Sequence, residues 1–183
     1  MKKVLLCTAV AALPFVAPAA HAYDGQINFN GELVAQTCTI DVNGTVTPAA
    51  ATVVLPTVST GALTAAGQTT GQTGFQINLA NCTGPAKSAA SFFESGPTVD
   101  LASGNLKTQT GTGAATNVQL QLVDGSNGSA IKAGDSFQRL TTTHVAFDGS
   151  GNAKLPYAVQ YYATGATTAG TVNSSVTYSI DYQ

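Results

Sequence analysis

The sequence predicts an all-β protein, and three observations support that prediction. Short stretches in which apolar and polar residues alternate recur along the chain, separated by turns rich in Gly, Asn and Asp. This period-two pattern is typical of strands with one buried face. No stretch has the periodicity of a long amphipathic helix, and only 9% of the residues are charged. Strands spaced in this way favour a sandwich of two sheets.

Residues 1–22 have the features of a secretory signal. Two lysines precede an apolar run, and the segment ends in Ala-His-Ala at Ala22, with small residues at the positions that matter for cleavage. The run is too short, and too interrupted by Pro14, for a membrane span of roughly 20 residues. We therefore expect the mature chain to begin at Tyr23 and to form one domain.

The charge of the chain argues against a nucleic-acid partner. Of the seven basic residues, two lie in the predicted signal, and the remaining five are scattered among nine acidic residues. A protein that binds nucleic acid usually gathers its basic residues into a patch. We expect no such partner here.

Two cysteines remain after Cys7 is removed with the signal, and we expect them to form a disulfide. Cys38 and Cys82 are an even pair in a chain bound for an oxidising compartment. A redox pair or a metal site would need a Cys-x-x-Cys spacing or nearby histidines, and the sequence has neither. The chain-entropy model gives a loop of this length a stabilisation of about 4 kcal/mol.

The first predicted strand lies at the start of the mature chain, over residues 23–34. Its polar face carries Asp, Gln, Asn and Glu at the even positions. An extended segment that is apolar on one side needs a sheet to join, either in its own chain or in another. The apolar face carries Tyr23, Gly25, Ile27, Phe29, Gly31 and Leu33.

Three further strands are predicted in the first half of the chain. Residues 52–58 are apolar and β-branched, and a proline within them indicates an edge or a bend. Residues 75–80 alternate, and residues 89–93 form a short apolar run. A weak helix at residues 59–66 would be kept short by its glycines.

Four strands are predicted in the second half. Residues 118–123 alternate and precede Asp-Gly and Asn-Gly pairs, which favour a hairpin turn. Residues 142–147 end at Asp-Gly-Ser-Gly, and residues 155–161 and 176–182 alternate again. Residues 107–116 consist mostly of Thr, Gly and Ala and are interpreted as a loop.

Enzyme motifs are missing from the sequence. His144 is the only histidine after the signal and lies inside a strand pattern, and there is no Gly-x-Ser-x-Gly elbow. Gly111 and Gly113 lack the third glycine of a dinucleotide loop and the lysine of a P-loop. The acidic residues occur singly, which is weak ground for an acid–base pair or a calcium loop. We predict no enzymatic activity, no cofactor and no metal.

The strand tyrosines have two interpretations. Tyr157, Tyr161, Tyr178 and Tyr182 could line a sugar-binding site. Tyrosines on the apolar face of a strand more often belong to the core, with the hydroxyl at its rim. We prefer the core interpretation.

Four stretches occur in an order that resembles one protein family. They are Gly-Gln-Ile-Asn-Phe-Asn-Gly at 25–31 followed by Cys38-Thr-Ile, Phe-Gln-Ile-Asn-Leu-Ala-Asn-Cys at 75–82, Leu-Pro-Tyr-Ala-Val-Gln-Tyr-Tyr-Ala at 155–163, and an end with Gly170 fourteenth from last and Tyr182 next to last. In this order the chain resembles the type 1 fimbrial protein family, the subunits of pili built by the chaperone–usher pathway.

The resemblance implies an incomplete immunoglobulin-like β-sandwich that lacks its seventh strand and is completed by donor-strand complementation. In that family a periplasmic chaperone first fills the open groove with one of its strands. At the outer-membrane usher, the extension of the next subunit replaces that strand, which is a form of strand addition. The implied division is a signal peptide at 1–22, a donor-strand extension at 23–36 and a pilin domain at 37–183.

The resemblance also assigns residues to the two sides of this exchange. Burial of an Ile and a Phe from the extension contributes roughly 1.5–3 kcal/mol each. A head-to-tail contact of this kind does not close into a ring, so the copies form a filament. The donor side chains would be Tyr23, Gly25, Ile27, Phe29 and Leu33. The acceptor groove and chaperone-binding strand would include Gly170, Val176, Tyr178, Ile180 and Tyr182.

The predicted function is that of a structural subunit in the shaft of an adhesive fimbria. Its expected partners are neighbouring copies of itself, a periplasmic chaperone, an outer-membrane usher and a tip adhesin. The expected location is the fimbrium on the extracellular surface of a Gram-negative bacterium, reached through the periplasm. The alternative is a self-complete secreted β-sandwich that binds carbohydrate as a monomer, with residues 23–34 paired within their own chain. A secreted hydrolase ranks third, because it lacks a catalytic constellation.

Overall fold

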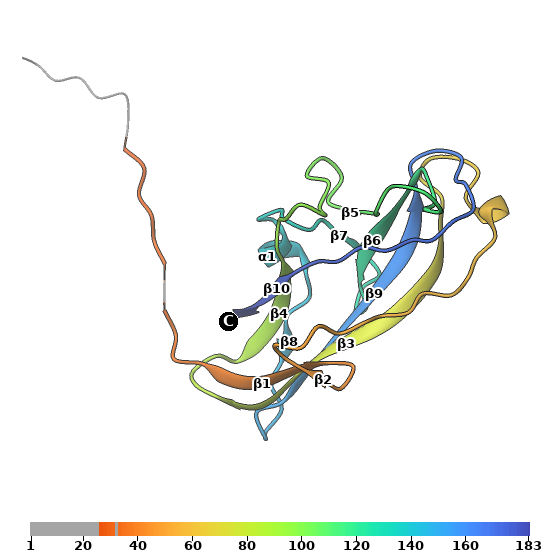
Figure 1. The fold of residues 1–183 in the computed structure, drawn as a ribbon. Helices are drawn as coiled ribbons and strands as arrows, with labels where there is room; N and C mark the ends of the chain where they lie inside the picture. The colour runs from red at the N-terminus through yellow and green to blue at the C-terminus, as the bar shows by residue number, and fades with distance from the viewer. Residues whose placement is uncertain (1–25, 32) are drawn as a thin grey trace, which may run out of the picture. The chain divides into compact units, whose positions relative to one another are not determined.

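The computed structural model describes residues 26–31 and 33–183. The chain divides into two units, 1–33 and 34–183, and each is considered by itself. All strands of the described chain lie in the second unit (Figure 1). In the described part of the chain, no helix is long and apolar enough to cross a bilayer.

The larger sheet has seven antiparallel strands. Its core is the pairing of β3 with β9, where Phe75 lies opposite Tyr157 and Ile77 opposite Leu155. The sheet order is β2-β1-β3-β9-β6-β5, and β7 pairs with β6 beside this path. The strands are β1 (Thr37–Val42), β2 (Thr45–Val46), β3 (Thr69–Thr83), β5 (Leu106–Lys107), β6 (Val118–Asp124), β7 (Ala130–Ile131) and β9 (Ala153–Ala163).

The smaller sheet has three antiparallel strands in the order β10-β4-β8. They are β4 (Ser88–Phe93), β8 (Val145–Ala146) and β10 (Tyr178–Tyr182). Because β4 pairs with both of the others, β10 is an edge strand with one side of its backbone outside the ladder. This edge position matters for the groove described below.

The core lies between the two sheets, which makes the fold a β-sandwich. Phe93 of the smaller sheet packs edge-on against Tyr157 of the larger one, with ring centroids 5.1 Å apart. The Tyr157 hydroxyl accepts a hydrogen bond of 2.8 Å from the backbone N–H of Ser91. Both Tyr157 and Ser91 are buried, so the core interpretation of this tyrosine is confirmed. Ile77, Leu79 and Leu155 complete the most buried layer.

Several predicted strands are confirmed. Residues 75–80, 89–93, 118–123 and 155–161 lie within β3, β4, β6 and β9. The turn predicted after β6 is also present, since the Gly128 N–H donates to the Asp124 carbonyl and the Asp124 N–H donates to the Ser129 carbonyl. The weak helix appears as a single 3₁₀ turn, η1 (Thr60–Ala62), capped by the Ser59 hydroxyl.

The prediction of a strand at 52–58 was wrong. Burial alternates along residues 51–55, and Val54 is 80% exposed while Val53 and Leu55 pack against the core. The segment has the side-chain pattern of a strand, but no strand of the described chain pairs with it. The alternation in the sequence therefore predicted correctly which side chains of this segment face the core, although the segment pairs with no strand of the described chain.

The predicted strand at 142–147 is reduced to β8, and a short helix that was not predicted, α1 (Gln138–Thr141), ends directly before the predicted range. The helix is held by a tertiary contact. The buried Gln138 amide accepts a hydrogen bond from the Phe93 N–H at 3.0 Å and donates one to the Phe93 carbonyl at 2.9 Å. This pair holds the helical turn against β4, and nothing in the local sequence predicts it.

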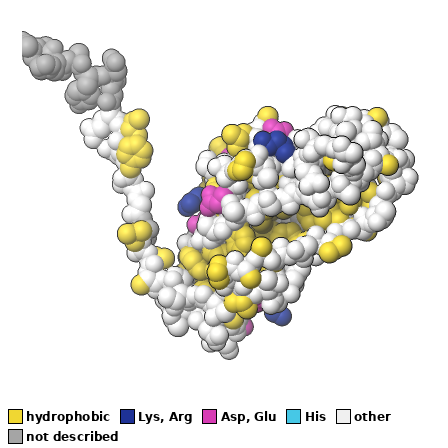
Figure 2. Space-filling view, viewed as in Figure 1, with side chains coloured by type: hydrophobic (Ala, Val, Ile, Leu, Met, Phe, Trp, Pro, Cys, Tyr) yellow, Lys and Arg dark blue, Asp and Glu magenta, His cyan; other side chains and the backbone are white. Residues whose placement is uncertain are grey.

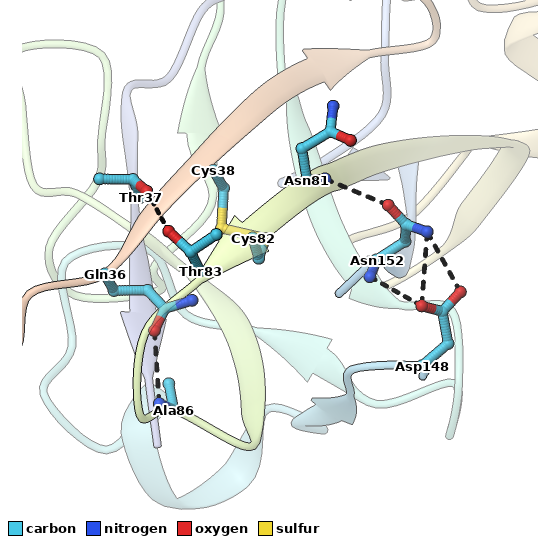
Figure 3. Close-up of a disulfide and its surroundings, with 9 residues drawn as sticks. All are labelled: Gln36, Thr37, Cys38, Asn81, Cys82, Thr83, Ala86, Asp148 and Asn152. Atoms are coloured by element: carbon cyan, nitrogen blue, oxygen red, sulfur yellow. Dashed lines mark hydrogen bonds between the residues drawn. A yellow bond between two sulfur atoms is a disulfide. The ribbon is translucent and has the colours of Figure 1, made fainter. Parts of the chain in front are cut away.

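The predicted disulfide is present and joins β1 to β3 (Figure 3). Beside it, the hydroxyls of Thr37 and Thr83 lie 2.7 Å apart. On the other side, the Asn152 side chain accepts a hydrogen bond from the Asn81 N–H at 3.2 Å. The disulfide therefore joins the start of β1 to the end of β3.

Candidate functional site

An open apolar groove of about 610 Å³ runs along the unit formed by residues 34–183. Figure 2 shows it as a hollow lined by yellow apolar side chains. Both sheets contribute to its floor, so the groove opens directly onto the core. The floor residues are Phe75, Ile77, Phe93, Leu120, Leu122 and Val159.

One wall of the groove is the segment 47–53. Pro48 begins a run of small side chains, Ala49 to Ala51, and Val53 follows. Small side chains leave room at this wall for larger groups to enter. Sequence reasoning missed this contribution, because a short alanine run carries no functional signal of its own.

The opposite wall is the segment 174–180, which leads into and includes the first residues of β10. Val176, Tyr178 and Ile180 line the groove, and their burial alternates with the exposed Thr177 and Ser179. This is the alternation that the sequence pattern indicated for the last strand. Its inward side chains come from the predicted acceptor set.

Two residues of the predicted acceptor set lie elsewhere. Tyr182 packs against the core but does not line the groove. Gly170 lies beside the 114–115 backbone, where an added Cβ would collide with the Ala115 nitrogen. Its lack of a side chain is therefore explained by a close backbone approach rather than by the groove.

The backbone on both walls of the groove is only partly paired. Residues 50–58 make no backbone–backbone hydrogen bond to another described residue. On the other wall β10 is an edge strand. Residues 172–177 belong to no strand ladder of the described chain, although the Asn173 and Thr177 carbonyls accept from the Gln109 and Glu94 N–H groups. An open apolar surface between an edge strand and an extended segment without backbone partners is a template for an added strand.

The Tyr178 hydroxyl is a polar group on the wall formed by residues 174–180. It is buried and has no hydrogen-bond partner in the described part of the chain. Burial raises the pKa of this phenol, and the negative charge of Asp41 raises that pKa further. The hydroxyl is therefore neutral at physiological pH and available as a donor.

The unit formed by residues 1–33 contains the predicted donor side chains. Ile27, Phe29 and Leu33 are 78%, 89% and 102% exposed. Residues 26–31 and 33 belong to no strand of the described chain (Figure 1). Tyr23 and Gly25 lie outside the described residues.

A small polar cluster forms around Asp181 of β10. The Asp181 carboxylate lies 3.5 Å from both Arg139 and His144, and Arg139 also stacks over the Phe92 ring at 5.3 Å. These residues come from distant segments, so the sequence pattern could not group them. Among the described residues, no three His, Cys, Asp or Glu side chains are placed to hold a metal ion.

Comparison with known proteins identifies the family. The family model of the type-1 fimbrial protein, A, matches residues 55–183. The major fimbrial subunit SMF-1 of Stenotrophomonas maltophilia is 45% identical over 90% of this chain and 95% of its own length. The F17 fimbrial protein of Escherichia coli is 42% identical over 88% of this chain and 89% of its own length.

Solved structures show the same fold. A type I fimbria protein and antigen of Burkholderia pseudomallei is 26% identical, with a TM-score of 0.52 over 81% of this chain and 97% of that chain. The P pilus rod subunit PapA is 19% identical, with a TM-score of 0.58 over 80% of this chain and 99% of that chain. Together with the family match, these similarities show that the chain belongs to the type-1 fimbrial protein family and is a structural subunit of a fimbria.

Proposed function

We propose that this subunit polymerises by donor-strand exchange, in which the extension of one copy, residues 23–36, adds as a strand to the groove of the next. The observation that supports this most directly is the groove itself, about 610 Å³ of open apolar volume between the edge strand β10 and a segment that pairs with no strand of the described chain. Strand addition supplies what such a groove lacks, namely main-chain hydrogen bonds and alternating side chains.

The extension has matching properties. Ile27, Phe29 and Leu33 recur with period two, so they lie on one face of an extended segment. The polar side chains between them would then face solvent. Tyr23 and Gly25 continue the same face toward the start of the mature chain, and Gly25 would leave room where the groove is tight.

On the acceptor side, Val176, Tyr178 and Ile180 would pack against the incoming apolar face. The unpartnered Tyr178 hydroxyl would gain a backbone carbonyl of the added strand as acceptor. Tyr182 would extend the pairing edge of β10 toward the C-terminus. Gly170 is not among the groove-lining residues, and its role in the exchange stays a prediction.

A carbohydrate-binding groove is disfavoured by the lining. A sugar site needs a few convergent polar groups that orient its hydroxyls, and the volume alone would fit a small ligand. The floor here consists of aliphatic and aromatic side chains, and the polar side chains of the lining are hydroxyls on the two walls: Thr47, Ser174, Ser175, Thr177, Tyr178 and Ser179. An apolar strand face suits this floor better than a polyol does.

The exchange implies a route and a set of partners. The contact between copies is head to tail and heterologous, so it extends into a filament on the cell surface. Before assembly, a periplasmic chaperone would cover the open groove. At an outer-membrane usher, the extension of the next subunit would replace the chaperone. A tip adhesin would stand at the end of the filament. The proposal includes the division of the chain into a signal at 1–22, an extension at 23–36 and a domain at 37–183. It requires no enzymatic activity of this chain.

Removal of residues 23–34 tests the proposal. All described strands lie in residues 37–183, so the shortened subunit should keep its secondary structure and its disulfide. Unboiled filaments sheared from cells should give a ladder of multiples on an SDS gel that collapses on boiling, and the deletion should abolish the ladder. A ladder that survives the deletion would overturn donor-strand exchange, and loss of the fold in the deleted protein would favour the self-complete sandwich.

A further inference from the structure

The chain has three Asn-Gly pairs, at Asn30, Asn43 and Asn127. An Asn-Gly pair can react with itself. The backbone nitrogen after the asparagine attacks the side-chain amide carbon, loses its proton, and ammonia leaves, which forms a succinimide ring. Water then opens the ring at either carbonyl and leaves aspartate or isoaspartate. Glycine favours the attack because it has no Cβ in the way.

The Asn43 pair is held by hydrogen bonds. The Asn43 side-chain oxygen accepts from the Gln76 N–H at 2.9 Å. The nitrogen that would attack, that of Gly44, donates to the Asp41 carboxylate at 2.7 Å. Both reacting groups are therefore occupied, and reaction would require the loop to open first.

The Asn127 pair is held in the same way. The Asn127 amide donates to Asp124 and to Thr143, and its oxygen accepts from the Ser129 N–H at 2.8 Å. The Gly128 nitrogen donates to the Asp124 carbonyl at 2.8 Å. This turn also fixes the reacting atoms in a network that does not let them meet.

The Asn30 pair has no such contacts. Asn30 and Gly31 are exposed, and neither makes a hydrogen bond to another described residue. The position where Gly31 would carry a Cβ has no heavy atom within 4 Å. Backbone and side chain at this pair are thus able to adopt the cyclising geometry without breaking any contact among the described residues.

We propose that Asn30 is a site of spontaneous deamidation in the unpolymerised subunit. The modification would convert an amide on the polar face of residues 26–31 into a carboxylate, and in the isoaspartate product it would add one methylene to the main chain. Water is the co-reactant, and no enzyme is required.

The consequence of the modification rests on the proposed function. If the segment pairs as a donor strand, the added methylene separates Ile27 and Phe29 from Leu33 by a longer backbone path, so the two parts cannot keep one register. A subunit that remains unpolymerised would thereby lose its donor strand with time. Once the strand is paired, its extended and hydrogen-bonded backbone would protect Asn30.

The first experiment follows the soluble, unpolymerised protein with its extension intact in mildly alkaline buffer. Peptide mass spectrometry with isoaspartate detection gives the rate at each asparagine. Asn30 should react at least about tenfold faster than Asn43 and Asn127, whose reaction needs local opening. Asn28 is a control in the same exposed segment that is followed by Phe29, with its side-chain oxygen accepting from the Gln26 amide at 2.8 Å. Equal rates at the three Asn-Gly pairs would overturn the proposal, and so would an Asn28 rate equal to that of Asn30.

The second experiment compares this protein with sheared filaments under the same conditions. Protection of Asn30 in filaments, with fast reaction in the soluble form, supports both the site and the donor strand. Fast reaction in both forms supports the site and contradicts donor-strand exchange. The variant Asn30→Gln, which keeps an amide on the polar face, should abolish the fast reaction at this position, and persistence of that reaction would overturn the proposal.

Discussion

Replacement of Phe29 by alanine should weaken the filament while leaving each subunit folded. The Phe29 side chain is 89% exposed in the subunit, so its burial in a neighbour's groove would remove nearly all of its surface from water. Full burial of such a side chain contributes up to about 3 kcal/mol. That free energy corresponds to a factor on the order of 100 in the equilibrium between joined and separated copies.

The assay is the rate at which sheared filaments break into monomers at a fixed guanidinium concentration, followed by light scattering. Phe29→Ala should raise this rate by as much as about 100-fold. The full increase is expected if the contact of Phe29 with the groove is already broken in the transition state for separation of the copies. The matched control is Asn28→Ala, since Asn28 is the neighbouring exposed residue on the polar face. It should change the rate little.

A groove variant completes the design. Ile180→Ala removes part of the wall that the Phe29 face would contact. If the two side chains meet, the double variant should cost less than the sum of the single variants. The reasoning would be refuted if Phe29→Ala and Asn28→Ala had equal effects, or if Phe29→Ala lowered the stability of the subunit itself.

Three further predictions concern the subunit's own stability. Replacement of Cys38 and Cys82 by serine should lower the free energy of unfolding by up to about 4 kcal/mol, measured by guanidinium denaturation against the oxidised protein. Tyr157→Phe leaves a buried backbone N–H without its acceptor and should cost about 1–3 kcal/mol in the same assay, whereas Tyr157→Phe with no change in midpoint would argue against that hydrogen bond. The pKa of Asp148 lies below its ordinary 3.8 because the backbone N–H of Asn152 donates to its carboxylate. Its contribution to the free energy of unfolding is therefore present above pH 3.8 and is lost as the pH falls through the lowered pKa. Asp148→Ala should lower the free energy of unfolding at neutral pH, and its difference from the wild-type value should narrow in acid.

The sequence predicted the paired strands well, because their signal is local. In β3, β6 and β9, apolar side chains alternate over enough residues to define a buried face. The pairing of Cys38 with Cys82 followed from having two cysteines in a secreted chain, and the structure contains it. Each of these inferences needed only residue type and spacing.

The candidate site was predicted only on one side. Val176, Tyr178 and Ile180 were found because they alternate in the last strand. The wall at 47–53 was not predicted, because its small side chains form a groove only together with the segment on the opposite side, which is distant in the sequence. Gly170 was assigned to the groove from family resemblance, and its environment shows a backbone contact instead.

What the sequence determined by itself is therefore the long alternating strands β3, β6 and β9, their inward faces and the apolar face of the extension, since each depends on period-two alternation within a few residues. The tertiary structure decided which strand is left at an edge and which segment stays unpaired. Residues 52–58 carry a strand pattern as clear as that of β4, yet they have no ladder partner among the described residues. Pairing depends on what lies across the sheet rather than along the chain, and this is why an open groove cannot be read from alternation alone.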